Sequence, residues 1–297
     1  VLVKLDERGK LNVRIGATIN EDHRTFAAWK RTLEWIDRNR QPSKLVTIIG
    51  VKGFMDGSLG SRTALMGAPY LDNPPESPDN QGFLLTMASN GDLEKLVETA
   101  ESMGLQPAVH AIGDQANHAV LEWYAKLLPA TRAELRPRIE HAQHLLPEDV
   151  ARFGTLGVVA SMQPYHKADD GRYAEARIGP ERCTTSYAFR SLLDGGGVLA
   201  FGSDWPVVSI SPWLGVWAAV SAKTLDGKTF VPEQSISVEE ALRAYTSGAA
   251  YAMHADDHTG VIREGMSADF AVLDRDPLAI PVDDIRSTAA TITVLDG

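Results

Sequence analysis

Residues Gln106 to Asn117 read QPAVHAIGDQAN, and this stretch decides which fold the chain is expected to adopt. A short apolar run ends at His110, an Ile-Gly-Asp turn follows, and apolar residues then recur at helical spacing. The pattern indicates a strand, a candidate ligand, a loop and a helix. In a parallel barrel, a side chain at the carboxyl end of a strand lies at the mouth, where chemistry takes place.

Three other stretches share this layout. RIEH ends at His141, LAFGSD ends at Asp204, and the β-branched run Leu45–Val51 is followed at once by Lys52. One lysine, two histidines and one aspartate are therefore expected at the ends of four separate strands.

Strands and helices alternate along the chain, which predicts an α/β protein built from parallel βα units. A run of this length favours a (β/α)8 barrel, but only six strands are predicted where a complete barrel has eight. The expected strands cover residues 11–19, 45–51, 106–110, 138–141, 157–162 and 198–204. The expected helices cover residues 25–38, 91–103, 117–128, 147–153, 183–194, 213–224 and 237–254.

Two domains are predicted. Residues 1–255 would form the incomplete barrel of about six βα units, whose last helix opens with a capping box at Ser237 and Glu240. Residues 256–297 contain short strands at 260–262, 268–274 and 291–295, which are typical of part of a small β-sandwich. Residues 53–80 form a long loop, and loops of that length are usually functional.

Composition excludes several classes of protein. The chain has 297 residues, of which 44% are hydrophobic and 23% charged, as in ordinary globular proteins. A net charge of -10 argues against a nucleic-acid partner. No apolar run is long enough to form a helix that crosses a membrane, so no membrane partner is expected. A single cysteine, Cys183, is typical of the cytoplasm. Because the chain starts with Val1, we expect a piece of a longer protein.

Five motifs together resemble a known family. VKGFMDGSLGSRTALM, VHAIGDQAN, RIEHAQ, SMQPYH and FGSDWPV occur in that order, followed by GVIREGMSADFAVLDRDPL. They are similar to the amidohydrolase superfamily of metal-dependent hydrolases, and within it to the amidohydrolase-3 or YtcJ-like branch that includes N-substituted formamide deformylases. The resemblance covers nearly the whole chain.

The resemblance implies a distorted barrel that binds one or two divalent metals. His110 and His141 match the metal-ligand histidines, Asp204 matches a general base that is often also a ligand, and Lys52 matches a lysine that is N-carboxylated in many members. It also implies hydrolysis of a non-peptide amide C–N bond in a small molecule. A cyclic amide or an ester is the alternative substrate.

Chemistry supports these roles separately. Neutral imidazole suits zinc, and a bound divalent ion acidifies water enough to supply a nucleophile at neutral pH. A carboxylate can then take the proton of the water and pass it to the leaving amine. Zinc is therefore the expected ion, although iron or manganese would use the same ligands.

The chain departs from the family in lacking an HxH pair, because no two of its eight histidines are separated by one residue. We expect that the first two βα units and the leading half of the sandwich are missing. At most one metal is then expected, on His110 and His141 with Lys52, leaving Asp204 uncoordinated. A non-catalytic remnant or binding protein is the alternative, and open sheet edges predict a homo-oligomer.

Five further residues are candidates for substrate contact: Ser61, Arg62, Gln163, His166 and Trp205. His166 is expected at the end of a strand, where substrate contacts occur. Ser61 and Arg62 could instead only brace their loop.

Other residues also have plainer interpretations. Asp204 could be the N-cap of a helix, Lys52 could be an exposed or ion-paired lysine, and a single strand-end histidine is often structural. His144 is expected to be an exposed residue at a helix start.

Overall fold

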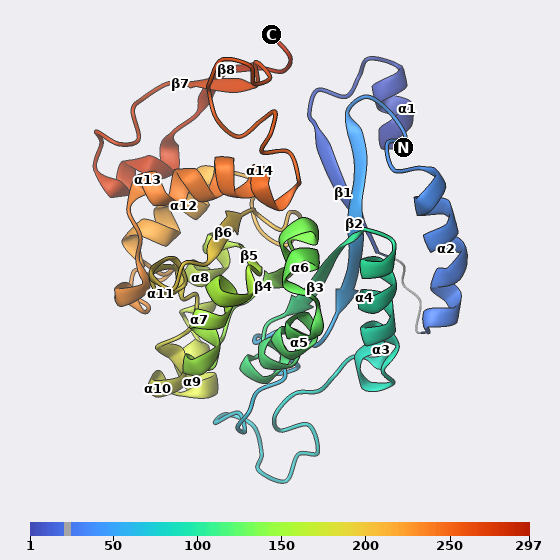
Figure 1. Cartoon of the computed structure of the whole chain (residues 1–297). Helices are drawn as coiled ribbons and strands as arrows, with labels where there is room; N and C mark the ends of the chain where they lie inside the picture. The colour runs from blue at the N-terminus through green and yellow to red at the C-terminus, as the bar shows by residue number, and fades with distance from the viewer. Residues whose placement is uncertain (21–24) are drawn as a thin grey trace.

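The computed structural model describes residues 1–20 and 25–297, and a six-stranded parallel sheet lies at its centre (Figure 1). The strands follow one another in the sheet in chain order, and helices cross over between them. They are β1 (Ile15–Ile19), β2 (Val46–Phe54), β3 (Gln106–Ala111), β4 (Arg138–His141), β5 (Val159–Met162) and β6 (Val198–Phe201). The prediction of an α/β fold with six strands of a barrel is confirmed.

Helices that connect consecutive strands, such as α4 and α5, cover the outer face of the curled sheet (Figure 1). In helix α4, for example, Leu93, Leu96, Val97 and Ala100 recur at helical spacing and are buried. The helices are α1 (Leu2–Glu7), α2 (Phe26–Arg38), α3 (Thr86–Ser89), α4 (Asp92–Ser102), α5 (Asp114–Lys126), α6 (Pro129–Leu135), α7 (Pro147–Leu156), α8 (Pro164–Asp170), α9 (Ala174–Ile178), α10 (Pro180–Cys183), α11 (Phe189–Asp194), α12 (Pro212–Ser221), α13 (Val238–Arg243) and α14 (Ala249–Ala252). Shorter turns are η1 (Pro232–Gln234), η2 (Ala244–Gly248) and η3 (Val282–Ser287).

The strand register separates an apolar face from a polar one. Residues paired across parallel strands point to the same side of a sheet. Phe54, His110, Glu140 and Ser161 are paired in a row across β2 to β5, whereas their neighbours on the other face, such as Val109, are buried in the helix-covered core. The inner face of the curled sheet therefore carries the polar side chains.

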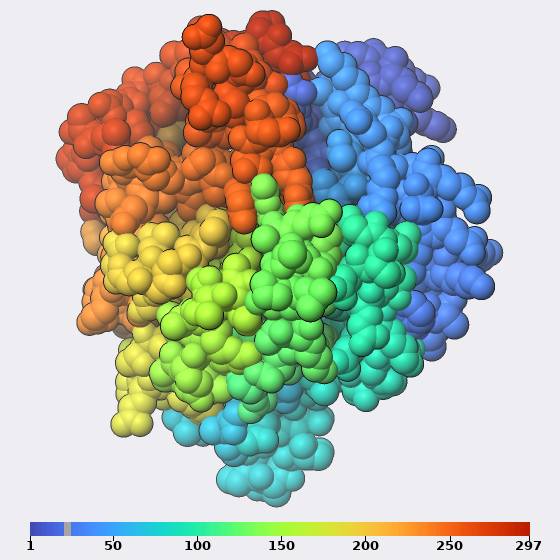
Figure 2. Space-filling view, in the orientation of Figure 1, coloured from blue at the N-terminus to red at the C-terminus, as the bar shows by residue number. Residues whose placement is uncertain are grey.

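The strand β2 is longer than expected, so Lys52 lies inside it rather than after it. The loop of residues 55–85 that follows lies beyond the carboxyl ends of the strands (Figure 1), and it projects at the foot of the molecule (Figure 2). It begins next to the polar face.

Three sequence-based expectations about secondary structure are wrong. Residues 183–194 are not one helix, because a turn and a bridge between Ser186 and His144 separate α10 from α11. Residues 260–262 form no strand. The helix expected over 237–254 starts with the predicted capping box at Ser237 but contains the π-helical turn η2 and ends at Ala252.

The C-terminal segment contains an antiparallel pair, β7 (Phe270–Leu273) and β8 (Ala290–Val294). Arg14 ties this pair to the start of the barrel through Asp269, with Nε and Oδ2 2.6 Å apart, and Lys44 Nζ lies 2.8 Å from Asp296 Oδ2. The division into domains at residue 255 stays a prediction. Among the described residues, no helix has both the length and the apolar composition needed to cross a membrane.

Candidate metal centre

Three side chains from three segments meet at or just beyond the carboxyl ends of β4, β5 and β6. His141, His166 and Asp204 each offer one ligand atom, and these atoms all lie within 4.8 Å of one another. His166 Nε2 is 3.8 Å from Asp204 Oδ2. Among the residues that the structure describes, these three form the group of at least three His, Cys, Asp or Glu side chains that could hold a metal ion.

His110 lies beside this group, with its ring centroid 4.5 Å from that of His141. Its Nε2 is 2.9 Å from the carbonyl oxygen of Gly57, so Nε2 carries the proton and donates it. Burial and the nearby Lys52 lower the pKa of His110 to about 4. The ring is therefore neutral near pH 7, and its lone pair is on Nδ1.

His141 ends β4 in a left-handed backbone conformation, with φ at 80°. Its Nδ1 donates to Gln163 Oε1 at 2.7 Å, while Gln163 Nε2 donates to the carbonyl of Ser161 at 3.2 Å and so orients the amide. Burial, followed by His110 and Lys52, lowers the pKa of His141 well below its usual value. The lone pair of His141 is therefore on Nε2, and an outer hydrogen bond holding the other nitrogen is typical of metal-bound histidines.

His166 was expected at the end of a strand, and this expectation is wrong. It lies in the first turn of α8, where it is buried. Its Nε2 has no hydrogen-bond partner among the described residues, and Oε1 of the neighbouring Gln143 has none either. Gln143 Nε2 is 3.4 Å from His166 Nδ1. With the Gln143 amide turned over, Oε1 would accept from Nδ1–H and leave the lone pair of Nε2 facing Asp204. The residues present thus fit a metal ion.

Asp204 follows β6 by three residues and has φ at 58°. Its side chain is 37% exposed, and burial raises the pKa of its carboxyl. Helix α12 starts only at Pro212, so Asp204 is not the N-cap of a helix. A carboxylate that water can reach, beside two imidazoles, can act as a ligand or as a proton acceptor.

Lys52 points to the same inner face. Burial lowers its pKa from 10.5 to about 8, while Glu140 and Asp204 act against this shift. Its Nζ lies 4.8 Å from the centre of the Phe54 ring. Glu140 is held by Arg138, with Oε1 and Nε 2.5 Å apart. A lysine with such a lowered pKa has more of the neutral amine that carboxylation by CO2 requires.

The other candidates for substrate contact lie on loops. Ser61 Oγ is bonded to Ser58 and Thr63 within its own loop, at 2.8 and 2.6 Å. Arg62 makes two bonds to Asp72, at 3.0 and 2.9 Å. These contacts favour the interpretation that the pair braces the loop.

Trp205 is 65% exposed next to Asp204. His144, expected to be exposed at a helix start, is instead buried, and its Nδ1 lies 2.7 Å from Ser186 Oγ.

Two polar residues of this region were missed by sequence reasoning. Glu140 alternates with Arg138 just before His141, and that spacing on a strand could have placed the pair on the inner face. Asp56 resembles any aspartate in a loop, but it is 1% exposed and lies 3.6 Å from His110 Nε2. No local signal marks its burial.

A family model described as the amidohydrolase family matches residues 1–297. The chain belongs to this family. It is 41% identical over 254 residues to the Arabidopsis thaliana protein LONG AFTER FAR-RED 3. The matched residues cover 84% of the chain and 42% of that protein. It is 33% identical over 271 residues to the putative amidohydrolase YtcJ of Bacillus subtilis (strain 168), covering 89% and 50% respectively.

Two further comparisons concern this amidohydrolase. The chain is 29% identical over 210 residues to the N-substituted formamide deformylase of Arthrobacter pascens, covering 70% of the chain and 39% of that enzyme. Its structure is similar to that of an uncharacterised metal-dependent hydrolase from Pyrococcus horikoshii OT3, with a TM-score of 0.79 and 33% identity over 95% of the chain and 55% of that protein. The predicted membership of the amidohydrolase-3, YtcJ-like branch is confirmed. The chain spans half or less of the length of these curated relatives.

Proposed function

We propose that this amidohydrolase hydrolyses a non-peptide amide C–N bond in a small molecule at a metal centre. The observation that carries the proposal is the meeting of His141, His166 and Asp204 within 4.8 Å, beside His110. The relative named N-substituted formamide deformylase supports an amide as substrate.

We propose zinc as the metal, with His110, His141 and Asp204 as ligands. The expectation that Asp204 stays uncoordinated is revised here, because its carboxylate lies in the group of side chains that could hold an ion. Imidazole and carboxylate donors suit zinc at about 2.0 to 2.2 Å, so the side chains would draw together by rotation about their χ angles. His166 would be a further zinc ligand through the lone pair on its Nε2. We prefer this role to the expected contact with substrate. N-carboxylated Lys52 would be an additional ligand, and we expect one ion in this chain. When bound, such an ion lowers the pKa of water from about 15.7 to about 7.

In this proposal Asp204 is the general base. Its carboxylate takes a proton from water as the water oxygen attacks the amide carbon, and it then gives that proton to the nitrogen as the C–N bond breaks. The products are a carboxylic acid and an amine. The partial exposure of Asp204 supports this role, because the group must meet both water and substrate.

Titration of the metal-free chain with zinc tests the centre. We expect His141→Ala to weaken zinc binding at least about ten-fold, because the variant removes a ligand. His258→Ala is the control, since His258 is 48% exposed, pairs with Asp257 and does not belong to the group that could hold a metal. Equal zinc affinity in the two variants would show that His141 is not a ligand.

A substrate panel tests the reaction. The zinc-loaded protein is assayed with N-substituted formamides, cyclic amides and esters, and Asp204→Asn is assayed in parallel. We expect hydrolysis of the linear amides and its loss in the variant. Preference for a cyclic amide or ester would support the alternative substrate, and zinc binding without any hydrolysis would support a binding protein.

We also propose a cytoplasmic protein that acts on a small molecule without nucleic-acid or membrane partners, as a homo-oligomer. The net charge of -10 and the single Cys183 support the first part. The homo-oligomer is supported by the sheet, whose edge strands are β1 and β6, because such edges pair readily with other chains. Light scattering after size-exclusion chromatography measures the oligomeric state, and a monomer would contradict it.

A further inference from the structure

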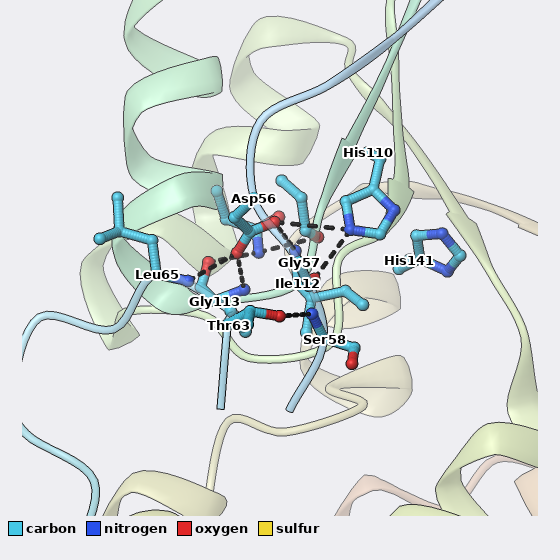
Figure 3. Close-up of polar contacts among 12 residues, drawn as sticks. Asp56, Gly57, Ser58, Thr63, Leu65, His110, Ile112, Gly113 and His141 are labelled. Carbon is cyan, nitrogen blue, oxygen red and sulfur yellow. Dashed lines mark hydrogen bonds and ion pairs between the residues drawn. The ribbon is translucent and has the colours of Figure 1, made fainter. Parts of the chain in front are cut away.

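Asp56 is a buried carboxylate just beyond β2, and its oxygens bind backbone groups of two loops (Figure 3). Oδ1 accepts from the N–H of Ile112 at 3.0 Å. Oδ2 accepts from the N–H groups of Gly113 and Leu65, both at 2.8 Å. Asp56 thus joins the loop after β2 to the loop after β3.

Two glycines allow the backbones to approach this closely. A Cβ atom at Gly113 would lie 2.0 Å from the carbonyl oxygen of Leu65. A Cβ atom at Gly57 would lie 1.9 Å from Thr63 Oγ1. Both contacts are far shorter than atoms tolerate. Gly113 is therefore in backbone contact with the loop after β2, and Gly57 packs closely against Thr63 of its own loop, which defines the position of the Gly57 carbonyl.

His110 faces this arrangement. Its Nε2 is 2.9 Å from the Gly57 carbonyl and 3.6 Å from Asp56 Oδ1 (Figure 3). A carbonyl only accepts, and so does a carboxylate in its ionised form. Burial raises the pKa of Asp56 to about 7, while the backbone N–H groups that it binds act against this shift, so the Gly57 carbonyl is the neighbour that only accepts at any pH. These neighbours therefore require a proton on Nε2 and leave the lone pair on Nδ1.

We propose that Asp56 is a positioning residue of the metal centre: it joins the two loops so that Gly57 holds His110 as the Nε2–H tautomer, with Nδ1 free to bind the ion. The inference rests on the proposed function, because it assigns His110 as a ligand. Asp56 touches neither substrate nor metal and acts through the ring of His110.

An asparagine at this position cannot do the same. Its amide has one accepting oxygen and an NH2 group, so one of the two sites filled by Asp56 oxygens would hold a donor. Placed at Oδ1, the NH2 group would face the N–H of Ile112 and Nε2 of His110. Losing the bond to Ile112 loosens the link between the two loops, so the Gly57 carbonyl no longer fixes the proton on Nε2. The Nδ1–H tautomer, in which Nε2 accepts from the NH2 group, then gains population and blocks the atom that would bind the ion.

The experiment compares Asp56→Asn with Asp149→Asn. Asp149 is an equally buried carboxylate on α7 that bonds to another histidine, His118, with Oδ2 and Nδ1 3.0 Å apart. The tautomer of each histidine is read from long-range 1H–15N correlation spectra of metal-free protein labelled with 15N-histidine. Zinc affinity is measured by titration, and the fold is checked by circular dichroism.

We expect His110 to be the Nε2–H tautomer in the unchanged protein and in Asp149→Asn, and to shift toward the Nδ1–H tautomer in Asp56→Asn. Zinc affinity should fall about ten- to hundred-fold in Asp56→Asn, as for other outer partners of metal ligands, and less than about three-fold in Asp149→Asn.

Unchanged tautomer and zinc affinity in folded Asp56→Asn would overturn the inference. If that variant does not fold, the tautomer of His110 in the unchanged protein still tests the inference. An Nδ1–H tautomer there would contradict the geometry on which the inference rests. Neither readout needs a substrate. Zinc binding that depends on Asp56, without amide hydrolysis, would therefore refute the proposed function and leave this inference standing.

Discussion

Raising the pH of metal-free protein through about 8, in carbonate-free buffer, should convert Lys52 to its neutral amine while an ordinary lysine stays charged. Burial lowers the pKa of Lys52 from 10.5 to about 8. At pH 8 about half of the Lys52 side chains would be neutral, compared with about 0.3% of lysines at the ordinary value. The neutral amine is the form that reacts with CO2, so its fraction should be on the order of a hundred times larger at this position.

Competitive labelling with acetic anhydride between about pH 6 and pH 10, followed by mass spectrometry of peptides, measures the midpoint for Lys52. Glu140→Gln tests the cause, because the carboxylate of Glu140 favours the charged lysine and its loss should move the midpoint lower. Glu94→Gln is the control, since Glu94 pairs with Lys126 at the surface. A midpoint at or above about pH 10, or a higher midpoint in Glu140→Gln, would refute the reasoning.

Three further predictions concern stability. Ser237→Ala should lower the free energy of unfolding by about 1 kcal/mol in urea titrations, because the N-cap bond at the start of α13 is lost; no change would show that the capping box contributes nothing. Arg62→Ala should cost at most about 1 kcal/mol, because its ion pair with Asp72 is partly exposed, and a larger loss of thermal stability would contradict a loop brace of this kind. Burial lowers the pKa of Lys167 to about 8, so the unfolded chain binds more protons than the folded chain between about pH 8 and pH 10.5. The free energy of unfolding should therefore rise with pH in that window. The rise should be smaller in Lys167→Met, a variant in which the Val231 carbonyl also loses its donor, and an equal rise would exclude Lys167 as its source.

Local pattern was sufficient to predict the order and type of the main elements. Each of the six predicted strands is present, because short apolar runs followed by turns and helical spacing depend on neighbours in the chain. The capping box at Ser237 is equally local. The helix expected over 183–194 failed for a tertiary reason, since Ser186 bonds to His144 and interrupts it.

The sequence by itself thus determined a parallel α/β fold, the family, and which strand-end residues deserved attention. Only the tertiary structure decided that His166 lies in a helix with its Nε2 toward Asp204, and that Asp56 is buried against His110. The Asp-Gly-Ser sequence at Asp56 is that of an ordinary turn. Its burial depends on the backbone of residues 112 and 113, which the pairing of β2 with β3 brings beside it. A contact between segments so distant in sequence forms only when the sheet does, because its partners are supplied by neighbouring strands and not by the local chain.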